Sequence, residues 1–302
     1  MKTKREPAEP LLRRYPSRET TLEKEGFLSA LYQPKADAYT DKVLILVGGS
    51  DGYFSLTKLI AEQYVGRGLT VLALAYWNQP GLPDTLCHIP LEYAEKAAVW
   101  LRQLGYSKVG IAGVSMGAEY ALLAASYFPE LISCCVAISP ISISTQGLQK
   151  KNARHRSMKL LEGSVFSVGG QDIPCGKLKF DKKQILKDSL RKKELCLTSC
   201  YDRAVAQAEG RIQAEKISGP VLLLAASQDS MWPSALAAEQ IVKWRQDQVT
   251  EYEHYTYASH LLVPCRLKSR KMFRMERKFP DECWKSNLEA FQKTLLFLRN
   301  SW

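Results

Sequence analysis

Short apolar segments alternate with longer segments of helical spacing along most of this chain. The short segments are rich in Val, Ile, Leu and Ala, which is typical of strands buried inside a sheet. Strands are expected at about 25–32, 42–47, 70–76, 107–112, 131–138, 220–225 and 251–257. Helices are expected at about 54–67, 90–104, 118–128, 234–244 and 286–298. This alternation predicts an α/β fold, with a mostly parallel sheet that helices cover on both faces.

Two stretches interrupt the alternation. Roughly 75 residues separate the strand that ends at 138 from the next one, whereas loops without structure of their own seldom exceed about 15 residues. We therefore expect an inserted lid or cap at about 141–217, helical over 182–208. Residues 1–25 are rich in Arg, Lys, Glu and Pro, which predicts an arm or a peripheral helix before a main domain at 26–302.

A serine lies at the junction of one expected strand and the helix after it. Residues 113–117 read Gly-Val-Ser-Met-Gly, a G-x-S-x-G pattern centred on Ser115. On so sharp a turn the flanking glycines avoid a Cβ clash, and the serine hydroxyl is exposed above the sheet. A plain tight turn is the alternative, but the strand and helix on either side favour a nucleophile elbow.

Serine needs a base, and the base needs a group that orients it. In the α/β-hydrolase arrangement an acid and then a histidine follow the serine, each after a later strand. Asp229 and His260 occupy those places. Taken singly, Asp229 could be a turn or N-cap residue and His260 an ordinary loop histidine. His254 is a rival, but it lies within an expected strand.

The remaining histidines fit the role less well. His88 precedes the serine in the chain, and His155 lies in the expected lid. The joint order and placement therefore favour Ser115, Asp229 and His260 as nucleophile, acid and base.

A developing oxyanion needs backbone N–H donors. One is expected from Met116, directly after the serine, and the other from the Gly-Gly-Ser-Asp-Gly loop at 48–52. Ser50 is the first choice and Asp51 the second, while Gly49 lets the backbone approach the substrate. A phosphate-binding P-loop is disfavoured, because the Lys and Ser/Thr of that motif are absent.

The formal net charge of +11 is concentrated at about 147–217 and 266–278. Such a surface is either merely solvated or attracts nucleic acid, anionic lipid or a phosphorylated small molecule. The sharper hypothesis is a pocket rim that receives an anionic substrate. No segment has the apolar length of a membrane span, and the charged N-terminus lacks a secretory signal, so a soluble cytoplasmic protein is expected.

Eight cysteines are scattered along the chain without the short spacings of a disulfide framework. Cys134 and Cys135 lie in an expected strand and point to opposite faces. Cys196 and Cys200 lack a second pair of ligands, so a zinc site is disfavoured. Reduced, mostly buried thiols are expected, and no metal or cofactor is assigned.

Several motifs together resemble the C-terminal catalytic domain of the acyl-CoA thioester hydrolase and bile acid-CoA:amino acid N-acyltransferase family. The resemblance covers roughly residues 40–302. It rests on the glycine loop at 48–52, Ile-Pro-Leu-Glu-Tyr at 89–93, Gly-Ser-Val-Phe-Ser-Val-Gly-Gly at 163–170, Gln228-Asp229 with Trp232, and His-Leu-Leu-Val-Pro at 260–264. It implies a dienelactone-hydrolase-like α/β-hydrolase fold, the same three catalytic residues, and substrate contacts at Gly49 and Trp232.

The chain departs from this family in two respects. About 40 residues precede the first shared strand, so the N-terminal β-sandwich of family members is not expected. The transferases of the family carry a cysteine where this chain has Ser115, which favours water over an amine as the acyl acceptor.

The sequence thus predicts a serine hydrolase acting on a small-molecule acyl ester or, more specifically, an acyl thioester such as an acyl-CoA. Two alternatives stay open. One is a carboxylesterase or peptidase-like hydrolase of an uncharged substrate. The other is a non-catalytic binding protein of the same fold, for which the basic charge would serve nucleic-acid binding.

Overall fold

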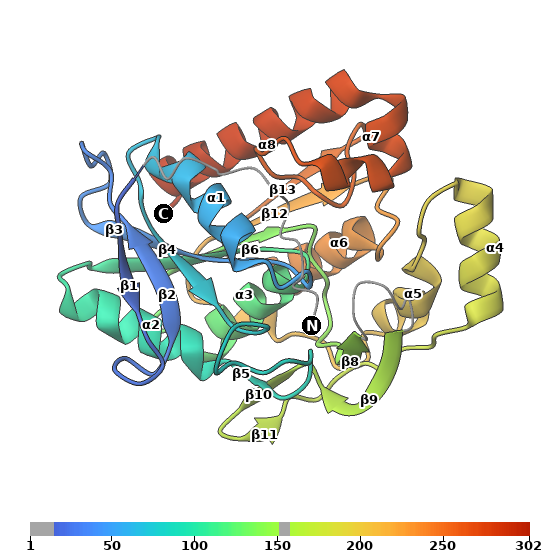
Figure 1. Cartoon of the computed structure of the whole chain (residues 1–302), viewed down its shortest axis with the longest axis horizontal. Helices are drawn as coiled ribbons and strands as arrows, with labels where there is room; N and C mark the ends of the chain where they lie inside the picture. The colour runs from blue at the N-terminus through green and yellow to red at the C-terminus, as the bar shows by residue number, and fades with distance from the viewer. Residues whose placement is uncertain (1–14, 151–157) are drawn as a thin grey trace, which may run out of the picture.

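The computed structural model describes residues 15–150 and 158–302, and an eight-stranded sheet runs through this part of the chain (Figure 1). Its strands are β1 (Ser17–Thr20), β2 (Leu28–Tyr32), β3 (Lys42–Val47), β4 (Thr70–Ala75), β6 (Lys108–Val114), β7 (Cys134–Ile138), β12 (Val221–Ala226) and β13 (Thr250–Tyr255). In space the order is β1-β2-β4-β3-β6-β7-β12-β13. Neighbours from β4 to β13 are parallel, whereas β1 and β2 are antiparallel to their neighbours.

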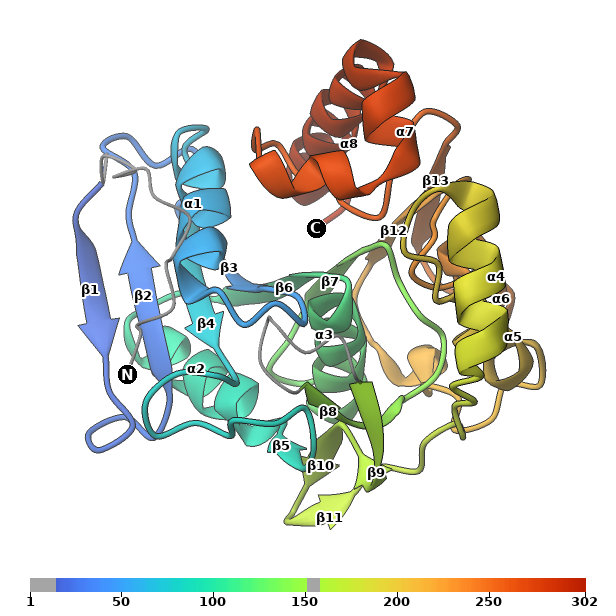
Figure 2. The same cartoon turned by 45° about the vertical axis from the view of Figure 1, so that its right-hand side comes forward.

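Two helical layers cover the two faces of the sheet (Figures 1 and 2). One face packs against α2 (Glu92–Gln103), α3 (Met116–Tyr127) and α6 (Ser234–Trp244), and the other against α1 (Phe54–Val65) and α8 (Pro280–Asn300). Along β3, Val43, Ile45 and Val47 join the first core, and Leu44 and Leu46 join the second. Side chains alternate between faces in a strand, so a strand covered on both faces is apolar throughout.

The segment between β7 and β12 begins with strands and ends with helices. It contains β8 (Gln146–Lys150), β9 (Met158–Ser164), β10 (Phe166–Val168), β11 (Gln171–Asp172), α4 (Lys182–Lys192), α5 (Thr198–Ala206) and the short helix η1 (Ala214–Lys216). β10 pairs with β5 (Ile89–Pro90), and this pairing ties the segment to the chain before α2. The short helices η2 (Lys268–Met272) and α7 (Arg274–Lys278) follow β13.

Most expected elements are confirmed, and two expectations are wrong in part. The predicted bounds of β3 and α6 agree with the structure. Ser17–Thr20, expected as arm or peripheral helix, forms strand β1 against β2. Residues 1–14 and His155 lie outside the described residues. The single helical stretch expected at 182–208 is two helices, because Lys193 ends α4 in the left-handed conformation with φ of 56°.

No helix within the two described ranges combines the length and the apolar character needed to cross a membrane. All eight cysteines are free. Burial raises the pKa of the Cys134 thiol well above its usual range and that of Cys135 to about 12, so both stay neutral inside β7.

A buried carboxyl group joins α3 to the start of the segment after β7. Glu119 is fully buried and accepts hydrogen bonds from the Thr145 backbone N–H (2.7 Å) and hydroxyl (2.8 Å). Burial raises the pKa of Glu119 to about 8, although both bonds from Thr145 oppose the shift. The folded protein therefore binds a proton at Glu119 more tightly than the unfolded chain does.

The protonated Glu119 predicts a stability that falls as pH rises. Its contribution is complete below the ordinary pKa of 4.5 and is lost as the pH rises toward 8. The Tm of Glu119→Gln should fall less than that of the wild type over this range, with a difference of roughly 5 °C. Scanning calorimetry across this pH range measures it, with the exposed Glu130→Gln as control. Parallel Tm curves for all three proteins would contradict the assignment.

Candidate active site

Ser115 lies at the sharp junction of β6 and α3, at the carboxyl end of a central strand. Its backbone has φ of 58° and ψ of −125°, a conformation that residues with a side chain rarely adopt. A Cβ at Gly113 would collide with the Gly117 carbonyl, and one at Gly117 with the Gly48 carbonyl. The two glycines of the motif thus allow three backbone segments to meet at the serine.

The structure brings Ser115, His260 and Asp229 into one hydrogen-bonded chain. The Ser115 Oγ lies 2.7 Å from His260 Nε2. The other imidazole nitrogen, Nδ1, lies 2.9 Å and 2.8 Å from the two carboxylate oxygens of Asp229. His260 and Asp229 are 4% and 8% exposed, and the Ser115 side chain is more accessible. An Nδ1–H donated to the carboxylate leaves Nε2 to accept the serine proton.

Asp229 also shapes its own loop. Its Oδ1 accepts hydrogen bonds from the backbone N–H groups of Met231 (2.9 Å) and Trp232 (3.4 Å). Asp229 is therefore both a turn residue and a partner of His260. The N-cap alternative is wrong, because Pro233 occupies the N-cap of α6.

The competing histidines have other partners. His254 lies in β13, and its Nε2 is 2.9 Å from the Ser227 hydroxyl. His88 Nδ1 lies 2.5 Å from Asp172 Oδ1 in a half-exposed pair beside β5.

Ser139, which directly follows β7, contacts the loop that carries His260. No sequence motif predicted a role for this serine. Ser139 Oγ donates to the His260 carbonyl (2.8 Å), and the Trp232 indole N–H donates to the Ser139 carbonyl (3.1 Å). The Trp232 and His260 rings meet edge to face with centroids 5.3 Å apart. Ser139 follows a parallel strand at the carboxyl edge of the sheet, and this position in the sequence could have marked it as a site residue.

Trp232 was expected to contact substrate. Its side chain is 3% exposed and packs between the His260 imidazole and the Tyr201 ring, whose centroid is 5.6 Å away. This placement makes Trp232 a support for the imidazole, and a direct substrate contact stays a prediction.

A buried ion pair holds the other side of the His260 loop. Arg270 and Glu276 form a 2.7 Å ion pair, and Ser259 donates to the same Glu276 oxygen at 2.8 Å. Arg270 also donates to the carbonyls of Val263 and Cys265. Both charged side chains are more than nine-tenths buried. No sequence motif marks this pair, because the two residues meet only after η2 and α7 have formed.

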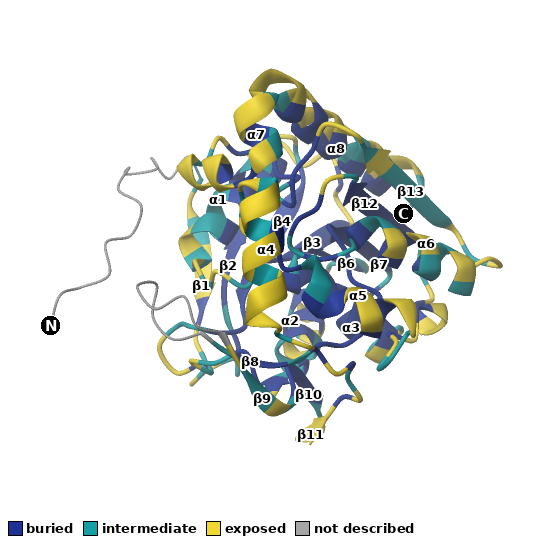
Figure 3. Cartoon of the chain, turned by 90° about the vertical axis from the view of Figure 1, so that its right-hand side faces the viewer, coloured by how far each residue is buried: buried dark blue, intermediate teal, exposed yellow. Residues whose placement is uncertain are grey.

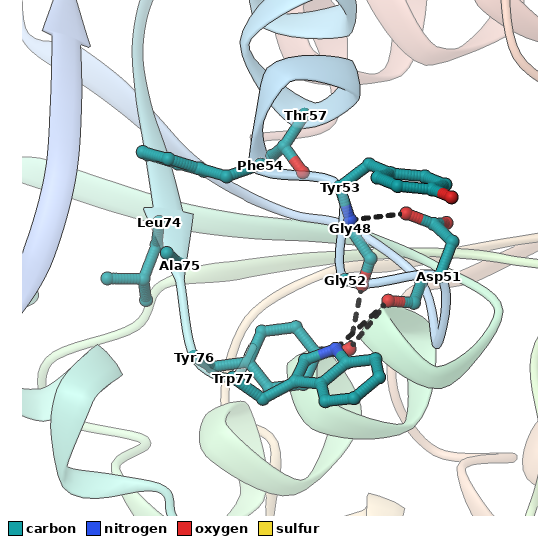
Figure 4. Close-up of a pocket in the computed structure, with 11 residues that line it drawn as sticks. Gly48, Asp51, Gly52, Tyr53, Phe54, Thr57, Leu74, Ala75, Tyr76 and Trp77 are labelled. Atoms are coloured by element: carbon teal, nitrogen blue, oxygen red, sulfur yellow. Dashed lines mark hydrogen bonds between the residues drawn. The ribbon is translucent and has the colours of Figure 1, made fainter. Parts of the chain in front are cut away.

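The glycine loop is anchored by aromatic side chains (Figure 4), and it lies against Ser115. A Cβ at Gly49 would stand 3.5 Å from the Ser115 Cβ. The Gly49 carbonyl accepts hydrogen bonds from Tyr76 (3.3 Å) and the Trp77 indole (3.4 Å). In a trans peptide the C=O and N–H point in opposite directions, so the Ser50 N–H points away from these two rings.

Asp51, the second choice for the loop donor, holds the end of the loop through its side chain, and a donor role of its backbone N–H stays a prediction. Asp51 Oδ1 accepts a hydrogen bond from the Tyr53 N–H (2.7 Å) just before α1. Beside it, the loop and β4 border a hollow of about 10 Å³, which has room for about one water molecule (Figure 4). The hydrogen bonds from Tyr76, Trp77 and the Tyr53 N–H therefore hold the glycine loop beside Ser115.

In the described ranges, no group of three His, Cys, Asp or Glu residues is placed to hold a metal ion.

Comparison with known proteins places this chain in a family. A family model described as "BAAT / Acyl-CoA thioester hydrolase C terminal" matches residues 89–300. The chain is 25% identical over 248 residues to "Acyl-coenzyme A thioesterase 2, mitochondrial" of Rattus norvegicus, a match that covers 78% of this chain and 48% of that protein. The chain spans about half the length of the curated relatives it matches. The family match confirms the resemblance that the motifs indicated.

Solved structures agree with the fold. The dienelactone hydrolase of Anabaena variabilis has a TM-score of 0.50 at 15% identity, with 95% of this chain and 98% of that chain covered. An acylaminoacyl peptidase of Pyrococcus horikoshii has a TM-score of 0.54 at 10% identity, with 96% and 42% covered. At such identities the likeness concerns the fold alone, and the predicted α/β-hydrolase fold is confirmed.

The Arg270–Glu276 pair predicts a large stability loss when one partner becomes neutral. Glu276→Gln leaves the buried guanidinium without its counter-charge, and the free energy of unfolding should fall by about 3 kcal/mol. Glu289→Gln, which removes the exposed pair with Lys285, should cost less than about 0.5 kcal/mol. Urea unfolding measures both. Equal losses for the two variants would contradict a buried, structural ion pair.

Proposed function

This chain belongs to the BAAT/acyl-CoA thioester hydrolase C-terminal family, and on that basis we propose that it is a serine hydrolase of acyl thioesters. The observation that carries the proposal is the continuous hydrogen-bonded chain from Ser115 through His260 to Asp229. A serine with a positioned imidazole and a buried carboxylate is the arrangement that acyl transfer to a hydroxyl requires.

The reaction follows from the order of these contacts. His260 Nε2 removes the hydroxyl proton as Ser115 Oγ attacks the thioester carbonyl, and Asp229 stabilises the imidazolium. The C–S bond then breaks, and His260 returns the proton to the leaving thiol. Water, deprotonated by the same imidazole, then attacks the acyl-serine; the bond from the acyl carbon to Ser115 Oγ breaks as His260 returns that proton to Oγ, and the acid is released. In each half-reaction His260 Nε2 first accepts one proton and then returns it, so His260 acts in turn as base and acid.

Two backbone N–H groups are proposed to bind the oxyanion. Met116 is the first residue of α3, where helix N–H groups lack intrahelical partners and the helix dipole favours negative charge. The Ser50 N–H is the second donor, because the Gly49 carbonyl on the same peptide faces Tyr76 and Trp77. Burial raises the pKa of Tyr76 well above its usual range, so the phenol remains a neutral donor to the loop.

The acceptor and the leaving group are inferred from different features. Ser115 stands where the family's transferases carry cysteine, and a serine ester passes its acyl group readily to water. Lys271 and Arg274 are exposed on either side of Phe273, whose ring lies 6.4 Å from that of His260. These cations support a leaving group that carries phosphates, as CoA does. Gly49, adjacent to Ser115, is the proposed backbone contact for the acyl carbonyl.

Removing the serine hydroxyl should abolish turnover. Ser115→Ala is expected to lower kcat/KM for an acyl-CoA by about 10⁴-fold, and to prevent labelling by a fluorophosphonate probe. Ser227→Ala removes a hydroxyl that contacts His254 and should keep both properties. A folded Ser115→Ala protein with wild-type turnover would refute the nucleophile. An unlabelled, inactive but folded wild type would favour the non-catalytic binding protein.

Reversing charge beside Phe273 should distinguish a thioesterase from an esterase of uncharged substrates. Lys271→Glu/Arg274→Glu is expected to raise KM for an acyl-CoA about tenfold and to leave KM for a short uncharged ester unchanged. Lys35→Glu, an exposed charge change near β2, is the control. Steady-state kinetics with both substrates measures the effect. Equal changes for both substrates would speak against phosphate recognition at this site.

A further inference from the structure

The outward face of α4 combines exposed leucines with a high density of positive charge. Leu190 and Leu186 are 69% and 60% exposed, the two highest values for large apolar side chains among the described residues. Figure 3 shows α4 as a largely exposed helix in front of the sheet. Water-exposed leucines one helical turn apart have no role in the fold of this chain, and such a face is typical of an interaction surface.

Local interactions fix which side of α4 faces outward. The Asp181 side chain caps the helix by accepting from the N–H groups of Lys183 and Gln184. Asp188, the one acid of α4, is buried on the inward side, where it accepts hydrogen bonds from Gln184 and Arg191 and forms an ion pair with Arg191. The leucines and the exposed cations share the opposite side. These cations are Lys182, Lys183 and Lys187.

A second basic segment extends this surface. The Arg277 side chain donates to the carbonyl of Lys193 at the end of α4, and the Arg274 N–H donates to Glu194 at 2.6 Å. Exposed cations of 268–278 therefore adjoin the C-terminal end of α4, and Met272 in the same segment is also exposed. The two basic stretches, which are far apart in the sequence, therefore adjoin each other in the fold and carry three exposed apolar side chains, Leu186, Leu190 and Met272.

We propose that this α4 face docks on the surface of an anionic lipid bilayer. A helix with a lysine-rich polar margin, a short apolar strip and low overall hydrophobicity lies in the interface, with leucines among the acyl chains and cations at the phosphates. Two copies of this chain would oppose like charges on this face. Nucleic acid would use the cations and leave the leucines in water. A bilayer satisfies both sets of side chains.

The docked helix is connected to the catalytic loops. In the segment after α4, the Leu197 N–H donates to the carbonyl of Ser230, the neighbour of Asp229, at 2.7 Å. Glu194 contacts Arg274, next to Phe273 and so close to His260. Binding through α4 therefore holds the protein at a lipid surface by an element that adjoins the catalytic loops. This inference concerns location and stands whether or not the proposed hydrolysis is correct.

Vesicle co-sedimentation of the whole chain tests the proposal. The vesicles are phosphatidylcholine alone, or phosphatidylcholine with about a third phosphatidylserine. The wild type should bind the second kind and lose most binding at roughly 0.5 M salt. Leu186→Gln/Leu190→Gln should weaken binding about tenfold, and Lys183→Glu/Lys187→Glu at least as much. Leu236→Gln/Leu296→Gln and Lys24→Glu/Lys35→Glu change matched exposed residues elsewhere and should bind like the wild type.

Three other results of this experiment would overturn the proposal. Absence of wild-type binding, or equal binding to both vesicles, removes the anionic bilayer as partner. Binding that depends on the lysines but not the leucines assigns the face to a general polyanion. Leucine-dependent self-association in sedimentation velocity, without vesicle binding, assigns it to a second copy. Thermal unfolding of every variant near the wild-type Tm verifies that the changes act on the surface.

Discussion

The close approach of backbone segments around Ser115 is the constraint on which the site depends. The serine is held at φ of 58° between glycines whose replacement by any larger residue would meet carbonyl groups of 117 and 48. The Ser115 N–H donates to the Ile138 carbonyl of β7 (2.9 Å), so the turn is an extension of the sheet. Strain of this kind persists only where surrounding structure determines it, and here β3, β6 and β7 together do so.

From that turn the rest of the site follows by sheet geometry. Parallel strands deliver their following loops to one edge, so the glycine loop after β3, Ser139 after β7 and Asp229 after β12 converge beside the serine. His260 is then fixed from two directions, by Ser139 with Trp232 and by Ser259 with Glu276. These buried hydrogen bonds keep one arrangement of the imidazole, and that is the preorganisation which the proposed proton transfer requires.

Local pattern predicted the elements and part of the site. Apolar runs identified the buried strands because both sheet faces are covered, and the G-x-S-x-G turn located Ser115 because its geometry is local. Asp229 and His260 were predicted from their order in the chain and from their places directly after expected strands. The contacts that support the His260 loop from η2 and α7 could not be predicted in this way. Arg270 and Glu276 meet through tertiary packing, and β1 pairs with β2 although its sequence has no strand-like alternation. The break at Lys193 was missed because a left-handed lysine has no sequence signature.

In the proposed mechanism, Ser115 carries the acyl group between two half-reactions. Rapid mixing of the protein with an acyl-CoA, followed by intact-mass and peptide analysis, tests it most directly. We expect a burst of one free thiol per chain, with the mass of one acyl group transiently added to the peptide that contains Ser115. Thiol release without any covalent adduct, or an adduct on another residue, would contradict it.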